Sequence, residues 1–156
     1  MTPSMTATAS APALRGPIQQ LFTTLERFPM SVIVLLFRIG VAMVFFKSGL
    51  TKIASWDITV QLFADEYALP LLPPAIAAYL GTTVELAAPW LLITGFATRF
   101  GAAALLGMTL TIQIFVYPEN WSEHLMWASL LIYLLTRGPG PISVDHFIRR
   151  AVTGDR

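Results

Sequence analysis

The sequence predicts an all-α integral membrane protein: a four-helix bundle with a surface helix before it and a lid segment on its outer face. Three observations support this fold class. The chain has 156 residues, of which 55% are apolar and only 12% are charged, whereas a soluble domain averages about 25% charged residues. Four apolar segments approach the roughly 20 residues that a membrane-spanning helix requires. Lysine and arginine are distributed unequally between the two sides of these segments.

Composition also excludes several classes of function. Ten Lys and Arg against nine Asp and Glu give a net charge of +1, which is not the basic excess that nucleic-acid binding requires. The chain has no cysteine, which excludes thiol, disulfide and iron–sulfur chemistry. Any redox role therefore requires a bound cofactor or a partner protein.

Two segments precede the first predicted span. Residues 1–16 are rich in Ala, Thr, Ser and Pro and are predicted to be disordered. The first 28 residues lack the features of a cleaved secretory signal, so we expect them to be retained. Residues 17–28 are predicted to form an amphipathic helix on the inner membrane surface, because apolar residues recur at helical spacing on one face. These residues are Ile18, Leu21, Phe22, Leu25 and Phe28.

The four spans are predicted at residues 31–50, 75–95, 100–117 and 121–136, within a membrane domain of residues 29–148. Proline, glycine and polar residues separate these segments, and a Gly-Pro-Gly-Pro sequence at 138–141 is expected to end the fourth helix. Recurrent small residues at four-residue spacing allow close helix packing, either within one chain or in an oligomer.

The segment between the first two spans, residues 55–69, is predicted to form a lid on the outer face. Ser55 or Asp57 is a candidate helix cap, and Trp56, Phe63 and Tyr67 would rest on the mouth of the bundle. An alternative interpretation is a structural lid that covers no ligand.

Orientation follows from lysine and arginine alone, because acidic residues contribute little to it. One side carries Arg15, Arg27, Arg99, Arg137, Arg149, Arg150 and Arg156, and the other carries only Lys47 and Lys52. We therefore expect a multi-pass membrane protein with both termini in the cytoplasm. Residues 149–156 would form a basic cytoplasmic tail.

Two charged residues fall inside predicted spans. Arg38 is expected about 12 Å from the inner boundary and Glu85 about 15 Å from the outer one, at 1.5 Å per residue. Because a charge at mid-membrane costs about 2.5 to 3.5 kcal/mol on insertion scales, such residues usually face the bundle interior and pair. The sequence therefore predicts an ion pair between Arg38 and Glu85. This pair would either fix helix register or form the floor of a polar cavity or proton path.

A second polar group is expected near the outer face. It combines hydrogen-bonding side chains with flat aromatic surfaces, which suits the carbonyl oxygens and ring of a quinone. The candidate ligand-binding residues are Lys47, Gln113, Tyr117, His124, Trp121 and Trp127. The alternative is an ordinary interfacial belt of aromatic and lysine residues. No metal site is predicted, and methionines are expected to fill the core.

Several short motifs, taken in order, resemble the DoxX family of small bacterial inner-membrane proteins. The resemblance covers about residues 30–148. Besides Arg38 and Glu85, the motif residues are Gly49, Lys52, Gly95, Arg99, Gly138, Gly140, Ser143 and Asp145. The resemblance implies a four-helix membrane protein often linked to oxidoreductases. Relatives include a membrane subunit of thiosulfate:quinone oxidoreductase and proteins that assemble with detoxifying redox enzymes.

The outer loop at 62–74 is also similar to a DoxX subgroup associated with the biosynthesis of modified copper-binding peptides, which implies a peptide-modifying partner. Two functions follow as hypotheses. The first is a membrane subunit or accessory of an oxidoreductase, not catalytic alone, that binds a quinone-like lipophile near the outer face. The second is an anchor or assembly protein for a partner complex, with no redox cofactor of its own. A small transporter is disfavoured because repeated broken helices are missing from the pattern.

Overall fold

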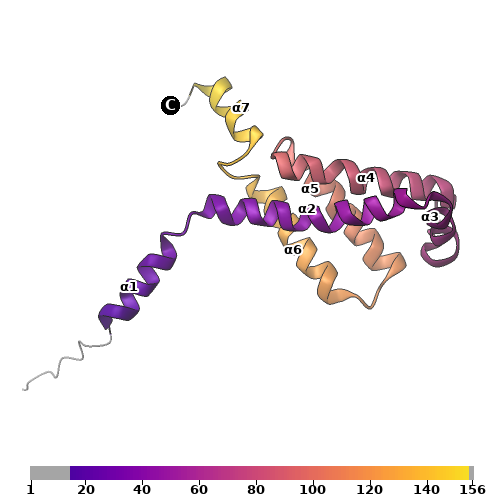
Figure 1. Cartoon of the computed structure of the whole chain (residues 1–156), viewed down its shortest axis with the longest axis horizontal. Coiled ribbons are helices and arrows are strands. Elements are labelled where there is room, and N and C mark those ends of the chain that lie inside the picture. Colours follow the sequence, from indigo (N-terminus) through magenta and orange to yellow (C-terminus); the bar gives the residue numbers. More distant parts are fainter. Residues whose placement is uncertain (1–14, 155–156) are drawn as a thin grey trace, which may run out of the picture.

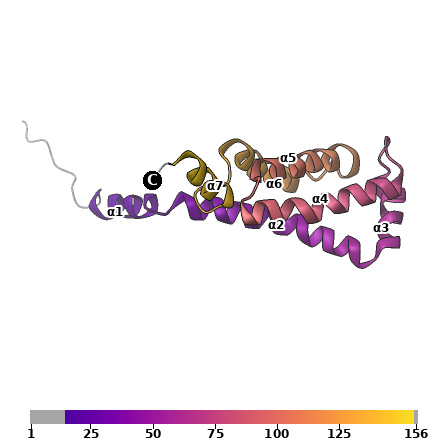
Figure 2. The same ribbon diagram turned by 90° about the horizontal axis from the view of Figure 1, so that it is seen from above.

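The structure is a computed structural model of the chain and describes residues 15–154 (Figure 1). Within this range the regular structure consists of seven α-helices and two π-helical turns, without strands. The predicted all-α fold class is therefore confirmed. Figures 1 and 2 show an elongated molecule, with the bundle towards one end and two shorter helices at the other.

Four helical segments form the bundle: α2 (Met30–Ala54), α4 (Pro74–Thr94), α5 (Thr98–Thr111) with its π-helical continuation η2 (Ile112–Val116), and α6 (Trp121–Arg137). α2 packs mainly on α4, α4 on α5, and α5 on α6, and α6 also contacts α2. Among the described residues, three helical stretches are long and apolar enough to cross a membrane: Met30–Ala54, Pro74–Thr94 and Thr98–Val116. α6 has 17 residues and coincides with the fourth predicted segment.

The bundle buries apolar side chains from every one of its helices. Phe45 of α2, Leu92 of α4, Leu105 of α5 and Leu131 of α6 belong to one contiguous core. Apolar side chains also cover the outside, including Leu36, which is 58% exposed. A helix that is apolar on all sides is typical of a membrane span, since its outer face meets lipid.

Glycines and a carboxylate define the helix ends on the side of the bundle that carries α7. α4 ends at Gly95, which has a left-handed φ of 73°, a conformation that glycine adopts without steric cost. The Asp145 carboxylate accepts hydrogen bonds from the backbone N–H groups of Ala97 and Thr98 at 2.8 and 3.1 Å. It thereby satisfies donors that the first turn of α5 would leave unpaired. α6 ends at Arg137, so the predicted stop at 138–141 is confirmed.

The predicted lid segment is helical and lies across the end of the bundle opposite to the chain termini (Figure 1). It consists of α3 (Trp56–Leu62) and the π-helical turn η1 (Phe63–Tyr67). Phe63 is buried against Ala77 and Ala78 of α4. Ser55 occupies the N-cap position of α3, but its side chain makes no capping hydrogen bond.

Two short amphipathic helices stand at the other end: α1 (Arg15–Glu26) and α7 (Val144–Thr153) (Figure 2). The helix predicted at 17–28 is present but begins at Arg15, so residues 15 and 16 are not disordered as predicted. The rest of the predicted disordered tail, residues 1–14, lies outside the described residues. The apolar face of α1, including Leu21 and Phe22, is exposed, and its position on the membrane surface stays a prediction.

The C-terminal segment has more regular structure than the sequence analysis predicted. Residues 149–153 of the predicted basic tail belong to α7, and 155–156 lie outside the described residues. Ser143 is the N-cap of α7, and its hydroxyl accepts a hydrogen bond from the backbone N–H of His146 at 3.2 Å. This local cap explains why the helix begins where it does.

Candidate functional site

A cavity of about 410 Å³ lies beneath the lid, between the halves of the bundle helices nearest to the lid. Residues of α2, η1, α4, α5, η2 and α6 line it. Most of its walls are apolar, formed by side chains such as Phe45, Leu80, Met108 and Trp127. Its volume falls in the range of small-molecule sites, which are typically apolar with a few polar groups that orient the ligand.

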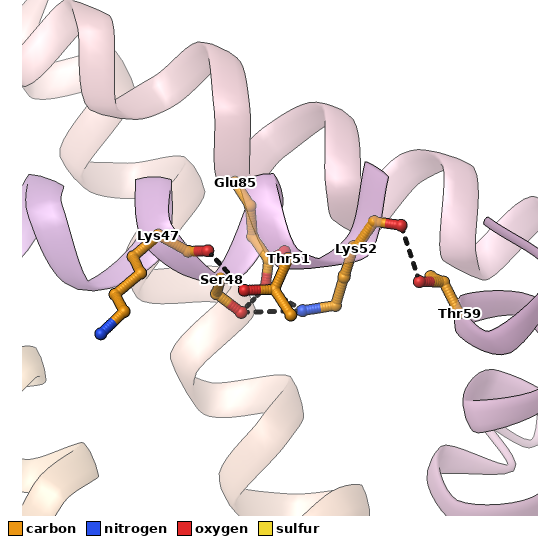
Figure 3. A network of polar contacts seen from close by, with 6 residues as sticks. All are labelled: Lys47, Ser48, Thr51, Lys52, Thr59 and Glu85. Carbon is orange, nitrogen blue, oxygen red and sulfur yellow. Dashed lines mark hydrogen bonds and ion pairs between the residues drawn. The ribbon is translucent and has the colours of Figure 1, made fainter. Parts of the chain in front are cut away.

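One polar wall of the cavity is a cluster of Ser48 and Lys52 from α2 and Glu85 from α4 (Figure 3). Lys52 Nζ lies 2.8 Å from Glu85 Oε1 and 2.8 Å from Ser48 Oγ. Ser48 Oγ donates to Glu85 Oε1 at 3.2 Å. Lys52 is 7% exposed and Glu85 4% exposed. The two charges are therefore removed from water and balance each other.

Helix geometry explains why these three side chains meet. Ser48 and Lys52 are four residues apart and share one face of α2. Between them, Gly49 lets α4 approach closely, since a Cβ there would lie 2.8 Å from Leu86 Cδ2 and 3.1 Å from Glu85 Cβ. The glycine therefore brings the Glu85 carboxylate within reach of Lys52.

The second oxygen of Glu85 has an unusual environment. Oε2 is buried and makes no hydrogen bond to any described residue. Leaving a buried acceptor unpaired typically costs about 1–3 kcal/mol. Since Glu85 lines the cavity, Oε2 is a candidate for hydrogen bonding to a ligand.

The predicted ion pair between Arg38 and Glu85 is wrong. Arg38 is 1% exposed, and its guanidinium donates to four backbone carbonyls instead. Nε bonds to Leu92 O at 2.6 Å, Nη2 to Ile93 O at 2.8 Å, and Nη1 to Pro139 O and Ile142 O. The first two carbonyls belong to the last turn of α4, where unpaired carbonyls favour a nearby cation.

The error in the predicted pairing comes from helix register. Glu85 packs level with Ser48 and Lys52, which lie roughly 15–20 Å along α2 from Arg38 at 1.5 Å per residue. The prediction placed both charges at similar depth by counting from the predicted span ends. Instead α2 continues to Ala54, four residues past its predicted end, and its outer part faces Glu85.

A second polar wall comes from His124 of α6, which is 4% exposed and lines the cavity. His124 Nδ1 lies 2.6 Å from Gln113 Oε1, and Gln113 Nε2 donates to Pro118 O at 2.7 Å. Because a carbonyl only accepts hydrogen bonds, the amide nitrogen of Gln113 must face Pro118, and Oε1 must accept from Nδ1–H. Neutral His124 therefore carries its proton on Nδ1 and has an acceptor lone pair on Nε2.

The π-helical turn η2 positions Gln113 for this role. Such turns are rare and are frequently found at functional sites, because the extra residue per turn redirects side chains. Here the turn covers Ile112–Val116, and Gln113 is buried within it. The local irregularity of the helix thus fixes the tautomer of His124.

Two tyrosines connect the lid to the bundle at the cavity. The Tyr117 hydroxyl donates a hydrogen bond to Glu66 of the lid. This bond, with burial as a second cause, raises the pKa of Tyr117 above its usual range. Burial likewise raises the pKa of Tyr67. Both side chains line the cavity and are neutral hydroxyl groups at physiological pH.

The six predicted ligand-binding residues separate into two groups. Tyr117, His124 and Trp127 line the cavity. Gln113 does not line it but hydrogen-bonds to His124 Nδ1. Lys47 and Trp121 do not line it: Lys47 is exposed, its amine directed away from Glu85 (Figure 3), and Trp121 is 64% exposed.

Sequence reasoning did not single out Ser48, and it named Lys52 only as a motif residue and Tyr67 only as a lid residue, not as members of a binding site. A signal for Lys52 was present. It lies seven residues after Phe45 and fourteen after Arg38, on the stripe of α2 that is buried in the bundle. A lysine at that spacing belongs to the inward face rather than to a solvated helix end.

Most of the remaining motif residues hold together the end of the bundle opposite to the lid. A Cβ on Gly95 would lie 2.5 Å from Ser143 Cβ and 2.6 Å from Arg38 Nη2, so a larger residue is excluded there. Gly138 and Gly140 take left-handed φ values of 82° and 77° in the loop after α6. Arg99 donates to Thr136 O at 3.4 Å. With Asp145 as a cap, these residues fasten the loop at 138–143 around Arg38.

The fold and the cavity together define a helical, multi-pass membrane protein whose bundle contains a largely apolar pocket with a few polar groups. The chain belongs to the DoxX family, whose model matches residues 33–118, and the resemblance found in the sequence is confirmed.

Two relatives extend this assignment. The chain is 31% identical over 134 residues to an uncharacterized protein of Haemophilus influenzae, covering 76% of this chain and 85% of that protein. It is also 31% identical over 127 residues to the inner membrane protein YphA of Escherichia coli, covering 73% and 89% respectively. No solved structure matches. The protein is therefore an integral inner-membrane protein of the DoxX family.

Proposed function

We propose that the cavity binds the head group of a quinone-like lipophile and that the protein serves as a membrane subunit or accessory of an oxidoreductase, without being catalytic alone. One observation carries this proposal: a largely apolar cavity has the Lys52–Glu85 pair on one wall and His124 on another. Apolar walls suit a ring and its hydrocarbon tail, and separate polar walls suit the two oxygens at opposite ends of the ring.

The membrane topology that goes with this function has α6 as a fourth span and both termini in the cytoplasm. It is supported by the packing of α6 against α5 and α2 and by the arginines at the end that carries α1 and α7. Single cysteines test it cleanly, because the chain has none. The cysteine of a Glu119→Cys variant should react with an impermeant thiol reagent in spheroplasts. The cysteine of a Thr153→Cys variant should react only after the membrane is permeabilised. The reverse pattern, or equal reaction, contradicts the topology.

Binding is testable with the purified protein in lipid nanodiscs, titrated with a short-chain alkyl benzoquinone. Quinones quench nearby tryptophans, and Trp127 lines the cavity. We expect saturable quenching of tryptophan fluorescence, most of which is lost in Trp127→Phe. Trp121→Phe is the matched control, because Trp121 lies on the same helix outside the cavity and should leave the saturable part intact.

Two results count against binding in the cavity. Quenching that rises linearly, without saturation, indicates simple partitioning into lipid. Saturable quenching that both variants preserve equally indicates a site elsewhere. In the first case the anchor or assembly function becomes the better hypothesis, and a co-purified oxidoreductase or peptide-modifying enzyme identifies the partner.

A further inference from the structure

We infer that the cavity prefers the reduced, dihydroxy form of its ligand over the oxidised, dicarbonyl form. This inference rests on the proposed function and adds to it the redox state that the site recognises. It follows from two hydrogen-bond acceptors on residues that line the cavity, neither of which receives a hydrogen bond from a described residue: Glu85 Oε2 and His124 Nε2.

The first acceptor is defined by the ion pair. Glu85 is paired with Lys52 at 2.8 Å, so its carboxylate is ionised and its oxygens only accept hydrogen bonds. Oε1 already has two donors, Lys52 Nζ and Ser48 Oγ. Oε2 is buried with none among the described residues. A ligand that satisfies Oε2 has to bring a hydroxyl or N–H group.

The second acceptor is defined by the chain of hydrogen bonds behind His124. Pro118 O fixes the Gln113 amide, and Gln113 Oε1 in turn fixes the proton on His124 Nδ1. In its neutral form the imidazole therefore offers only a lone pair at Nε2. His124 is 4% exposed and belongs to the cavity wall, so a ligand group bonding to Nε2 must also be a donor.

A phenolic hydroxyl can satisfy these two acceptors and a carbonyl oxygen cannot. A hydroxyl donates to Glu85 Oε2 or His124 Nε2 and still accepts, for example from the third N–H of Lys52. A carbonyl oxygen only accepts hydrogen bonds, so it leaves both acceptors unpaired. Its lone pairs also repel the lone pairs of Glu85 Oε2 and His124 Nε2. Sites built to hydrogen-bond a hydroxyl discriminate strongly against analogues that lack it, because the buried partner is left unpaired.

The test uses the wild-type protein in nanodiscs under anaerobic conditions and three probes with one alkyl tail: a hydroquinone, its benzoquinone, and the dimethyl ether of the hydroquinone. The ether keeps the size of the ring and its oxygens but has no O–H donor. We expect the hydroquinone to bind at least about tenfold tighter than either of the others, which corresponds to about 1.4 kcal/mol.

A substitution tests whether the preference for the hydroquinone arises at His124. His124→Phe should reduce the hydroquinone-to-benzoquinone affinity ratio towards one, while His146→Phe, on α7 at the other end of the molecule, should leave it unchanged. Equal or tighter binding of the benzoquinone by the wild-type protein overturns the inference and leaves the proposed quinone site in place. No saturable binding of any probe overturns both. Because the decisive comparison uses the wild-type protein, it does not depend on the variants folding.

Discussion

Replacing either Lys52 or Glu85 alone is expected to lower the free energy of unfolding by about 3–5 kcal/mol, the usual cost of leaving one buried charge without its partner. Both side chains are almost fully buried. Replacing both with methionine should cost much less, since no charge is then left uncompensated and the apolar side chains fill similar space.

A double-mutant cycle of Lys52→Met and Glu85→Met measures this coupling, with unfolding followed by circular dichroism in mixed detergent and SDS. Lys47→Met is the matched control: it removes a lysine from the same helix whose amine is directed away from Glu85 (Figure 3), and it should change stability by less than about 1 kcal/mol. Additive effects of the two single substitutions would show that the residues do not interact.

Arg38→Met is expected to have an effect of similar size, at least about 3 kcal/mol. Hydrogen bonds to charged groups contribute roughly 1.5–3 kcal/mol each, and the guanidinium donates to four carbonyls from two separate segments. Its loss leaves the carbonyls of Leu92 and Ile93 without this donor in a buried position. It also detaches the loop that contains Pro139 and Ile142 from α2.

Two comparisons distinguish this role from a general need for positive charge. Arg38→Lys keeps the charge but not the planar fork of donors, and it should recover only part of the lost stability. Arg99→Met removes an exposed arginine that makes a single 3.4 Å bond to Thr136 O, and it should cost less than about 1 kcal/mol. Equal effects of Arg38→Met and Arg99→Met on the unfolding midpoint would refute the proposed role of Arg38.

The helices could be placed from sequence because the membrane fixes their length and composition. A stretch of about 20 apolar residues has few alternatives to a helix in lipid, where every backbone group must be paired. The turn at Gly95 and the stop at 138–141 carried equally local signals. α7 was missed, although Ser143 three residues before His146 is a recognisable N-cap.

The partners of the buried charges could not be placed, because they depend on how helices slide against each other. Similar distances counted from the predicted span ends suggested that Arg38 and Glu85 meet. The actual register is set by packing at Gly49, against Leu86 and Glu85 of α4. The partners of Arg38 include a loop about 100 residues later in the chain, which no local pattern predicts.

The candidate site was predicted only in part, because the sequence did not show which face of each helix points into the bundle. His124 and Trp127 are three residues apart on α6 and share a face, whereas Trp121 is rotated by roughly 120° from Trp127 at about 100° per residue. Lys47 and Lys52 are likewise on different faces of α2. Depth in the membrane was a good guide to the right region, but only the packing of the bundle shows which face of each helix points inwards.

Photoaffinity labelling tests the central claim, that the cavity beneath the lid is a lipophile-binding site, most directly. The protein in nanodiscs would be irradiated with an azide-bearing alkyl benzoquinone in each of its two redox states, and the labelled peptides identified by mass spectrometry. The account predicts labelling of α2 around residues 44–52 and of α6 around 123–127, suppressed by excess unlabelled ligand. Label spread over lipid-facing residues such as Leu36, unaffected by competition, would contradict it.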